Sequence, residues 1–376
     1  MKLLHTSDWH LGASEGTRSL AEDQAFFINE ICRIIAEKQV DAVLIAGDVF
    51  DRSIASAEAI ALYDYAMTRI CADLNVPALV IAGNHDGAER LASCQKLLRR
   101  ARLYVAGSLE RGAEPVGLGN TEIFLLPWIT EAKVKSVFPE KVDDIKNLTD
   151  AYAAVTDDMR QRFTPGKRHI ILSHAFITDS ETSTSDRAAE IGFASQVDAD
   201  VFEGFDYAAL GHIHKAQSVN ARVRYSGTPM PYSFGKEETQ IKSVMLIDTE
   251  TMLMEAVPLA LLHKRSTLTG TLKELLHPAC TSEEQNGYVR VRVTDTYVGL
   301  NAISELRTVY PNLIEVSGLA YEGGSGAYSI SMDEFEILEQ DPLEIFRHFC
   351  RDEAGGEPDG HMLELFRAAV KTVEDR

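Results

Sequence analysis

Five short blocks of the sequence carry side chains that can bind metal ions, and each block follows an apolar run with the length of a strand. The blocks supply carboxylate, amide and imidazole groups, which are common ligands of divalent cations. Five of the 11 histidines fall inside them, a concentration that scattered surface histidines would not show. In chain order the blocks are Ser7-Asp8-Trp9-His10, Gly47-Asp48, Gly83-Asn84-His85-Asp86, Ser173-His174 and Gly211-His212-Ile213-His214.

These residue types suit a hydrolysis that uses two metal ions. Two divalent ions about 3.5–4 Å apart can stabilise both the attacking and the leaving oxygen of an in-line displacement. A carboxylate is the best bridge between them, because its two oxygens can bind both ions and offset their mutual repulsion. We therefore predict that Asp48 bridges the ions. The other predicted ligands are Asp8, His10 and His214 at one ion, and Asn84, His174 and His212 at the other.

Two further residues are candidates for contact with the substrate. His85 is next to a predicted ligand but is assigned to neither ion, so it could protonate the leaving oxygen or stabilise the transferred phosphoryl group. Arg52 completes the spacing Gly-Asp-x-x-Asp-Arg, in which the arginine of phosphatases grips phosphate. Imidazole and carboxylate ligands without a thiolate favour Mn²⁺, Fe²⁺ or Zn²⁺ over Ca²⁺.

A single block of this kind is more often a turn, a helix cap or a half-exposed pair of histidines than a metal site. Five blocks in this order, each behind an apolar strand, make that interpretation weak. We therefore expect a binuclear metal centre.

The elements that must position the blocks alternate between strand and helix patterns over the first 250 residues. This alternation predicts an α/β layered fold with strands buried on both faces. The carboxyl ends of strands in an open α/β sheet face one crevice, so the five blocks can converge there. Strands are predicted at 2–6, 42–46, 78–82, 122–126, 169–172, 207–209, 223–225 and 243–247, and helices at 20–37, 57–74, 89–100 and 142–163.

The pattern changes after Pro258. We predict a first domain at 1–258, a small α+β domain at 259–320, a linker at 321–332 and C-terminal helices at 333–376. The linker is predicted from its Gly- and Ser-rich composition. The terminal helices have apolar stripes in an acidic background, which fits either docking on a partner helix or folding back on the chain's own core.

Composition narrows the class of protein. The formal net charge of −20 argues against tight, autonomous binding to nucleic acid, which calls for a basic face. The five cysteines are scattered and never spaced as Cys-x-x-Cys, which indicates reduced thiols. No apolar run approaches 18 residues, and the N-terminus is too polar for a secretion signal, so we expect a cytoplasmic protein.

The ordered blocks resemble those of the calcineurin-like metallophosphoesterase superfamily. Within it, the opening His5-Thr6-Ser7-Asp8-Trp9-His10-Leu11-Gly12 is similar to the SbcD family, the nuclease subunit of the bacterial SbcCD DNA-repair complex. The same holds for Ala46-Gly47-Asp48-Val49-Phe50-Asp51 and Tyr225-Ser226-Gly227-Thr228-Pro229. The resemblance is dense over residues 1–236 and looser afterwards.

This resemblance implies a Mn²⁺-dependent exonuclease on double-stranded DNA ends, with endonuclease activity on single strands and hairpins and Mg²⁺ as the second metal candidate. It implies His85 as the catalytic histidine that binds no metal. Relatives from other kingdoms often carry a histidine at the position of Asp51, which this chain lacks. The family layout adds a capping domain, C-terminal helices that dock on an SbcC-type ATPase, and a homodimer contact through helices 57–74 and 89–100, within a heterotetramer. Packing of these two helices on the sheet alone explains their sequence equally well.

Two other functions stay open at this stage. The first is a metallophosphatase or small-molecule phosphodiesterase of the same superfamily, which the Gly-Asp-x-x-Asp-Arg spacing favours. Against it, the third block continues with Asp86 rather than glutamate, and the last block is of the nuclease kind. The second is a non-catalytic scaffold, which the presence of every expected ligand makes weakest.

Overall fold

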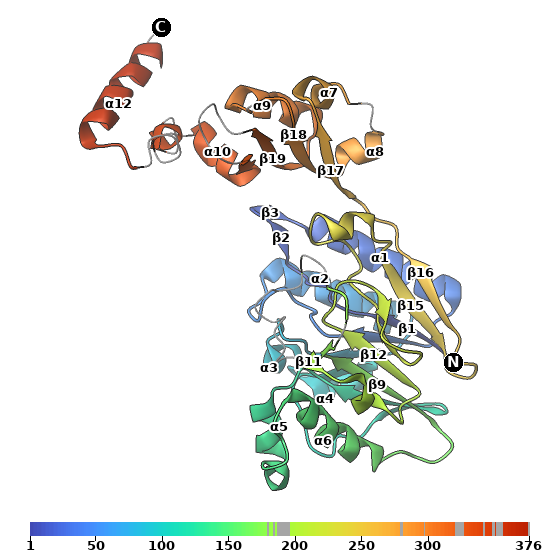
Figure 1. Cartoon of the computed structure of the whole chain (residues 1–376). Coiled ribbons are helices and arrows are strands. Elements are labelled where there is room, and N and C mark those ends of the chain that lie inside the picture. The colour runs from blue at the N-terminus through green and yellow to red at the C-terminus, as the bar shows by residue number, and fades with distance from the viewer. Residues whose placement is uncertain are drawn as a thin grey trace. The chain divides into compact units, whose positions relative to one another are not determined.

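The structure, a computed structural model, describes residues 1–178, 180–182, 185, 196–278, 281–296, 298–319, 327–340, 343–347, 350 and 356–374. The chain divides into two compact units, both drawn in Figure 1. The first unit is Met1–Ser14 with Arg18–Leu262, and the second is Glu15–Thr17 with His263–Arg376. No helix among the described residues is both long enough and apolar enough to cross a bilayer.

The described part of the first unit contains two six-stranded sheets. In the first sheet, β1, β4, β5 and β6 run parallel, and β15 and β16 add antiparallel strands at one edge. Every residue of β4 and β5 is buried, as expected for strands covered on both faces. The strands, in sheet order, are β16 (Met254–Pro258), β15 (Ser243–Asp248), β1 (Lys2–Thr6), β4 (Ala42–Ala46), β5 (Ala78–Ile81) and β6 (Leu103–Ala106).

The second sheet also contains four parallel strands but differs at its edges. Its four inner strands β14, β12, β9 and β8 are parallel, and an antiparallel strand closes each edge. In sheet order the strands are β13 (Gln217–Ser218), β14 (Val223–Tyr225), β12 (Tyr207–Gly211), β9 (Arg168–His174), β8 (Thr121–Leu126) and β7 (Val116–Leu118).

An apolar core joins the two sheets face to face. Leu44 of the first sheet lies in one buried cluster with Ile170 and Leu172 of the second. The residue between them on β9, Ile171, belongs to the other cluster, where the sheet packs on helix α6 (Leu148–Arg160). This alternation follows from the two-residue period of a strand. Each such fully buried side chain contributes about 1.5–3 kcal/mol, so the two sheets hold their relative position without help from the site.

The helices of the first unit differ from the predicted ones at three places. The predicted helix at 57–74 is α2 (Ala57–Met67) followed by a π-helical turn, Thr68–Asp73. The one at 89–100 is interrupted, because Cys94 takes a left-handed φ of 59° between α3 (Ala88–Leu91) and α4 (Gln95–Leu98). The predicted helix at 20–37 matches α1 (Ala21–Lys38).

The third difference concerns the helix predicted at 142–163, which begins later as α6. Its N-terminal cap is Asn147, whose side chain accepts a hydrogen bond from the Asp150 backbone at 2.8 Å. Such a cap satisfies an N–H group that the first turn leaves without a partner. A separate short helix, α5 (Glu131–Val137), precedes it.

The second unit is a small α+β domain. Three parallel strands and one antiparallel strand form its sheet, and a buried apolar cluster joins that sheet to the helices. The elements are β17 (Arg265–Gly270), α7 (Leu272–Leu276), α8 (Ser282–Asn286), β18 (Tyr288–Val293), α9 (Leu300–Val309), β19 (Leu313–Leu319), β20 (Ala327–Ser331), α10 (Met332–Gln340) and α12 (Gly360–Glu374).

The predicted linker at 321–332 needs correction. Its last part forms β20, because Ile330 pairs with Val316 of β19 and is buried in the small core. Residues 321–326 of that segment lie outside the described residues. Helix α10, at the start of the segment 333–376 predicted to hold the C-terminal helices, buries Phe335 in the same core, so it belongs to the small domain. The α/β fold class itself is confirmed.

Candidate metal centre

The structure brings all five blocks to one place at the ends of five strands. Strands β1, β4 and β5 of the first sheet carry the first three blocks, and β9 and β12 of the second sheet carry the other two. The parallel pairing of β9 with β12 sets His174 opposite Gly211, immediately before His212. The predicted convergence therefore occurs across two sheets that face each other.

The first cluster contains the three residues predicted to hold one ion. One ligand atom from each of Asp8, His10 and His214 lies within 4.8 Å of the others, and all three residues are buried. The Nε2 atoms of His10 and His214 are 3.1 Å apart. Two nitrogen ligands about 2.1 Å from the same ion and at about a right angle have such a separation. The donor set and spacing fit a divalent ion.

The second cluster contains the ligands predicted for the other ion. The amide oxygen Oδ1 of Asn84 lies 2.9 Å from Nε2 of His174 and 3.1 Å from Nδ1 of His212. Ligand atoms of Asp48, His174 and His212 also lie within 4.8 Å of one another. An amide oxygen, a carboxylate and two imidazoles form a donor set suited to Mn²⁺, Fe²⁺ or Zn²⁺.

Asp48 lies between the two clusters. Its Oδ2 is 3.4 Å from Nε2 of His174 in the second cluster and 3.9 Å from Nε2 of His10 in the first. Its Oδ1 accepts a hydrogen bond from the backbone N–H of His85 at 2.9 Å. The carboxylate therefore faces imidazoles of both clusters, as a bridge must.

The backbone of four predicted ligands is in the left-handed region. Asp8, His10, Asp48 and His212 have φ angles of 53°, 43°, 49° and 103°. Non-glycine residues in this region carry strain that the surroundings must offset. Hydrogen bonds between the loop after β1 and the loop after β4 help to offset this strain. The N–H groups of Asp8 and His10 donate to the carbonyls of Gly47 and Asp48, both at 3.0 Å.

Two glycines of the blocks allow the close approach of the strands. Gly47 has a φ of 84°, and a Cβ atom there would lie 2.4 Å from Nδ1 of His174. At Gly211 a Cβ atom would lie 1.9 Å from the carbonyl oxygen of Ala46. Any side chain at either position would push the second sheet away from the first.

Burial sets the charges of the cluster. It raises the pKa of Asp8 to about 8, against the opposing effect of His174. Burial also lowers the pKa of both His10 and His212 to about 3. For His174, burial opposes the charge, but Asp48 and Asp8 together raise its pKa to about 9. The neutral rings of His10 and His212 can offer a lone pair to a cation at once, whereas Asp8 and His174 must each lose a proton first.

His85 is more open than the predicted ligands beside it. Its side chain is 9% exposed, whereas that of His174 is fully buried. Its Nδ1 lies 2.9 Å from the carbonyl oxygen of Asp51, which can only accept, so Nδ1 donates. Nε2 then faces the cluster, 3.9 Å from Oδ2 of Asp48. Atoms of His85, His10 and Asp51 also come within 4.8 Å of one another.

The other substrate candidate, Arg52, lies at the surface. Its side chain is 77% exposed, and its Nε is 3.5 Å from Oδ2 of Asp51. Both residues line a cavity of about 350 Å³ that also includes Leu11 and Gly12, next to the first block. Arg52 can therefore reach a ligand in that cavity.

Sequence reasoning missed two residues around the clusters. Asp86 accepts backbone hydrogen bonds from Val49, Phe50 and Gly83 at 2.8–3.1 Å and so joins the second block to the third. Burial and the nearby Asp48 raise its pKa to about 6. Trp128 stacks on His212 with ring centroids 5.4 Å apart, from a loop that carries no recognisable sequence signal.

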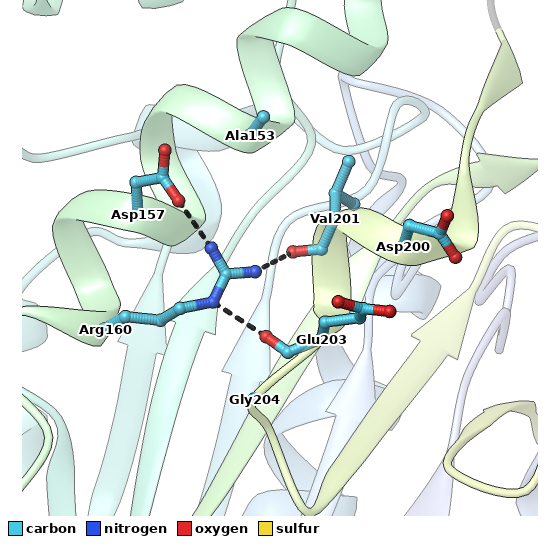
Figure 2. A pocket seen from close by; sticks show the side chains of 7 residues that line it. All are labelled: Ala153, Asp157, Arg160, Asp200, Val201, Glu203 and Gly204. Carbon is cyan, nitrogen blue, oxygen red and sulfur yellow. Dashed lines mark hydrogen bonds and ion pairs between the residues drawn. The ribbon is translucent and has the colours of Figure 1, made fainter.

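A larger cavity, of about 540 Å³, lies between α6 and the segment 199–204, away from every predicted site residue. Figure 2 shows that its one cation, Arg160, is already engaged by Asp157 and by the carbonyls of Val201 and Glu203. The remaining charged lining is acidic. This cavity therefore offers no site for a phosphate.

Comparisons with known proteins match both units. A family model described as calcineurin-like phosphoesterase matches residues 1–216. A second, SbcD_C, described as the type 5 capsule protein repressor C-terminal domain, matches residues 258–354. The SbcD subunit of the SbcCD nuclease of Staphylococcus epidermidis (strain ATCC 12228 / FDA PCI 1200) is 31% identical over 375 residues, 99% of this chain and 97% of that protein.

Solved structures give weaker likenesses. TT1561 of Thermus thermophilus is 14% identical and covers 68% of this chain and 98% of its own, with a TM-score of 0.35. GAP50, the anchor in the inner membrane complex of Plasmodium, is 10% identical and covers 87% and 99%, with a TM-score of 0.38. The chain belongs to the calcineurin-like phosphoesterase family and, within it, to the SbcD family of SbcCD nuclease subunits.

Proposed function

We propose that this protein is the nuclease subunit of an SbcCD-type complex, which hydrolyses phosphodiester bonds at DNA ends and hairpins in repair and recombination. The observation that carries the proposal is the position of Asp48 between two clusters of buried ligands. Family membership and the full set of ligand blocks support the same reaction class.

In this proposal the two clusters hold one divalent ion each, with Asp48 as the bridge. The ions would supply the charge that stabilises the oxygens of the phosphate during in-line displacement. We propose Mn²⁺ as the metal and Mg²⁺ as the second candidate. The donor set supports a transition metal, because imidazoles accompany the carboxylates among the predicted ligands.

The geometry of His85 supports its role as the catalytic residue. With Nδ1 donating to the carbonyl of Asp51, the ring is held with Nε2 toward the cluster. From there a protonated Nε2 can donate a hydrogen bond or a proton to the leaving oxygen. Arg52, at the rim of the adjoining cavity, is proposed to contact the backbone of the substrate.

An SbcC-type ATPase is the proposed partner, with α12 as the docking element. This helix exposes Met362 and Leu365, at 40% and 59%, which a partner helix could cover. A partner that supplies most of the DNA-binding surface also accounts for the net charge of −20 on this chain. The four described cysteines are free thiols, which supports a reducing compartment such as the cytoplasm.

A homodimer within a heterotetramer is the proposed assembly. Ile60 of α2 and Leu97 of α4 are 54% and 63% exposed, so both are available to pack against a second copy of the chain. A charge at Ile60 should therefore yield monomers, as light scattering on the purified protein would detect, whereas a charge at Ile241, which is 78% exposed, should not.

The proposed function is tested by a nuclease assay on blunt duplex and hairpin DNA with Mn²⁺, with and without the ATPase partner. Metal-dependent cleavage of both substrates is the expected result. A metallophosphatase would instead hydrolyse phosphomonoesters and leave DNA intact. A protein that binds no metal and cleaves neither substrate would be the non-catalytic scaffold.

A further inference from the structure

A buried ion pair lies directly behind one of the predicted metal ligands. Nζ of Lys242 is 3.0 Å from Oε2 of Glu237, and the two side chains are only 3% and 0% exposed. Burying both charges is costly, and replacing such a pair by apolar residues often stabilises a protein. The position of this pair therefore calls for a reason beyond stability.

The lysine holds the backbone of the ligand loop. Besides Glu237, its ammonium donates to the hydroxyl of Thr228 at 2.8 Å and to the carbonyl oxygen of His214 at 3.3 Å. The N–H group of Thr228 donates to the same carbonyl at 3.2 Å. Lys242 thus ties the backbone of His214 to the loop that follows β14.

The glutamate reaches the ring of the same histidine through one hydroxyl. Ser185 donates its hydroxyl hydrogen to Oε1 of Glu237, and its oxygen lies 2.5 Å from Nδ1 of His214. Burial opposes the charge of Glu237, but the ammonium of Lys242 lowers its pKa, so the carboxylate can only accept. The only hydroxyl hydrogen of Ser185 is therefore donated to Glu237 and is not available to His214.

This arrangement decides the tautomer of His214. Since the hydroxyl hydrogen of Ser185 points to Glu237, its oxygen must accept from Nδ1–H of His214. Nε2 is then the unprotonated nitrogen, and it is the one that faces His10 at 3.1 Å in the first cluster. A carboxylate that fixes the tautomer of a ligating histidine commonly strengthens metal binding.

We propose that Glu237 and Lys242 are positioning residues for the first metal ion, acting through Ser185 and through the backbone of His214. The inference rests on the proposed metal centre. Neither residue touches the ion or the substrate. Glu237 orients the ring of His214, and Lys242 both fixes the loop and keeps Glu237 charged.

The test measures Mn²⁺ binding to the full-length chain by titration calorimetry and by electron paramagnetic resonance of the bound ions. The variants Glu237→Gln and Ser185→Ala should each weaken the binding of one of the two Mn²⁺ ions about 10- to 100-fold. The other ion should keep its wild-type affinity. Ser185→Ala leaves the ion pair in place, so it remains informative where Glu237→Gln lowers the yield of folded protein.

Glu122→Gln is the matched control. Glu122 is also a buried carboxylate, 3.0 Å from the Nζ of Lys167, but it lies on β8 and contacts none of the predicted ligands in the described structure. This variant should lose stability and bind both ions as the wild type does. Wild-type affinity for both ions in Glu237→Gln and Ser185→Ala would overturn the inference. Absence of Mn²⁺ binding in the wild type would instead refute the metal centre itself.

Discussion

Asp48 and His174 form a buried ion pair across the two sheets, with Oδ2 3.4 Å from Nε2. Asp48 belongs to the loop after β4 and His174 ends β9, so the contact joins two strands of different sheets. Nδ1 of the same imidazole lies 2.7 Å from the carbonyl oxygen of Ala46 and donates to it. The proton on Nε2 therefore occupies the place at which a ligating histidine must present a lone pair.

The first prediction is that metal binding releases protons. Because the pKa of Asp8 is raised to about 8 and that of His174 to about 9, the metal-free protein carries both protons at pH 7. A ligating carboxyl group must be ionised and a ligating histidine neutral, so binding of two Mn²⁺ ions at pH 7 should release about two protons, and affinity should rise as the pH increases toward 9. Calorimetry in two buffers with different ionisation enthalpies measures this, and equal heats in both would contradict it.

The second prediction concerns the bridge. Asp48→Asn removes the negative charge that faces both clusters, and asparagine tolerates the left-handed backbone of this position better than alanine does. We expect loss of both ions, measured as metal content after dialysis. Two retained ions would show that Asp48 is not the bridge. Asp51→Asn, a nearby carboxylate outside the predicted ligand set, serves as the control and should keep both ions.

The third prediction separates catalysis from metal binding. His85→Ala should lower turnover on DNA by about 10²- to 10⁴-fold, the usual range for loss of a general acid. Both ions should remain, because the ring is outside the predicted ligand set. Measuring the cleavage rate and the metal content of the same variant distinguishes a catalytic role of His85 from a role as a metal ligand. A variant that loses an ion would assign His85 to the ligands.

The fourth prediction is a dependence of stability on pH at Glu122. Burial opposes its charge, but the hydroxyl of Thr164 and the ammonium of Lys167 lower its pKa from 4.5 to about 2. A lowered pKa stabilises the fold above pH 4.5, and this contribution fades as the pH falls toward 2.

Glu122→Gln should therefore lower the free energy of unfolding by on the order of 1–3 kcal/mol at pH 7, as for other hydrogen bonds to charged groups. Urea unfolding at pH 7 and at pH 3 should show a smaller difference between variant and wild type at pH 3. An equal difference in the free energy of unfolding at pH 7 and at pH 3 would mean that Glu122 stabilises the fold by packing and not by its charge.

The fifth prediction concerns partner binding. Leu365→Asp on α12 should abolish co-purification with the ATPase partner and leave Mn²⁺-dependent cleavage of single strands unchanged. Deletion from residue 333 would be a poorer test, because it removes Phe335 from the core of the small domain. Glu364→Gln, an exposed change on the same helix, is the control. A stable complex with Leu365→Asp would exclude this docking role.

The ligand blocks could be predicted from the sequence because each is local. An apolar run followed by a glycine and a polar ligand marks a strand end in any context, as in Gly47-Asp48 and Gly211-His212. The distribution of the five strands over two sheets is not local, since it depends on pairings such as β9 with β12. The sequence carries no pattern from which that division follows.

The support of the site was harder to predict for the same reason. Glu237 and Lys242 are in an aperiodic segment, and their role depends on a serine more than 50 residues away. The helix break at Cys94 and the late start of α6 each depend on the backbone conformation of a single residue. The helical spacing of apolar residues around them gives no sign of either. The strand β20 was assigned to the linker because a glycine-rich sequence directly precedes it.

Because the predicted ligands lie on two different sheets, bound ions should make the protein more resistant to heat. An ion held by β1 and β12, or by β5 and β9, cross-links two sheets that otherwise meet mainly through apolar side chains. Because the unfolded chain would not assemble either cluster, an ion at 100 times its dissociation constant adds about 2.7 kcal/mol to the free energy of unfolding. Chelators should accordingly lower the melting temperature, and a cell short of the bound metal would hold a protein that is easier to degrade.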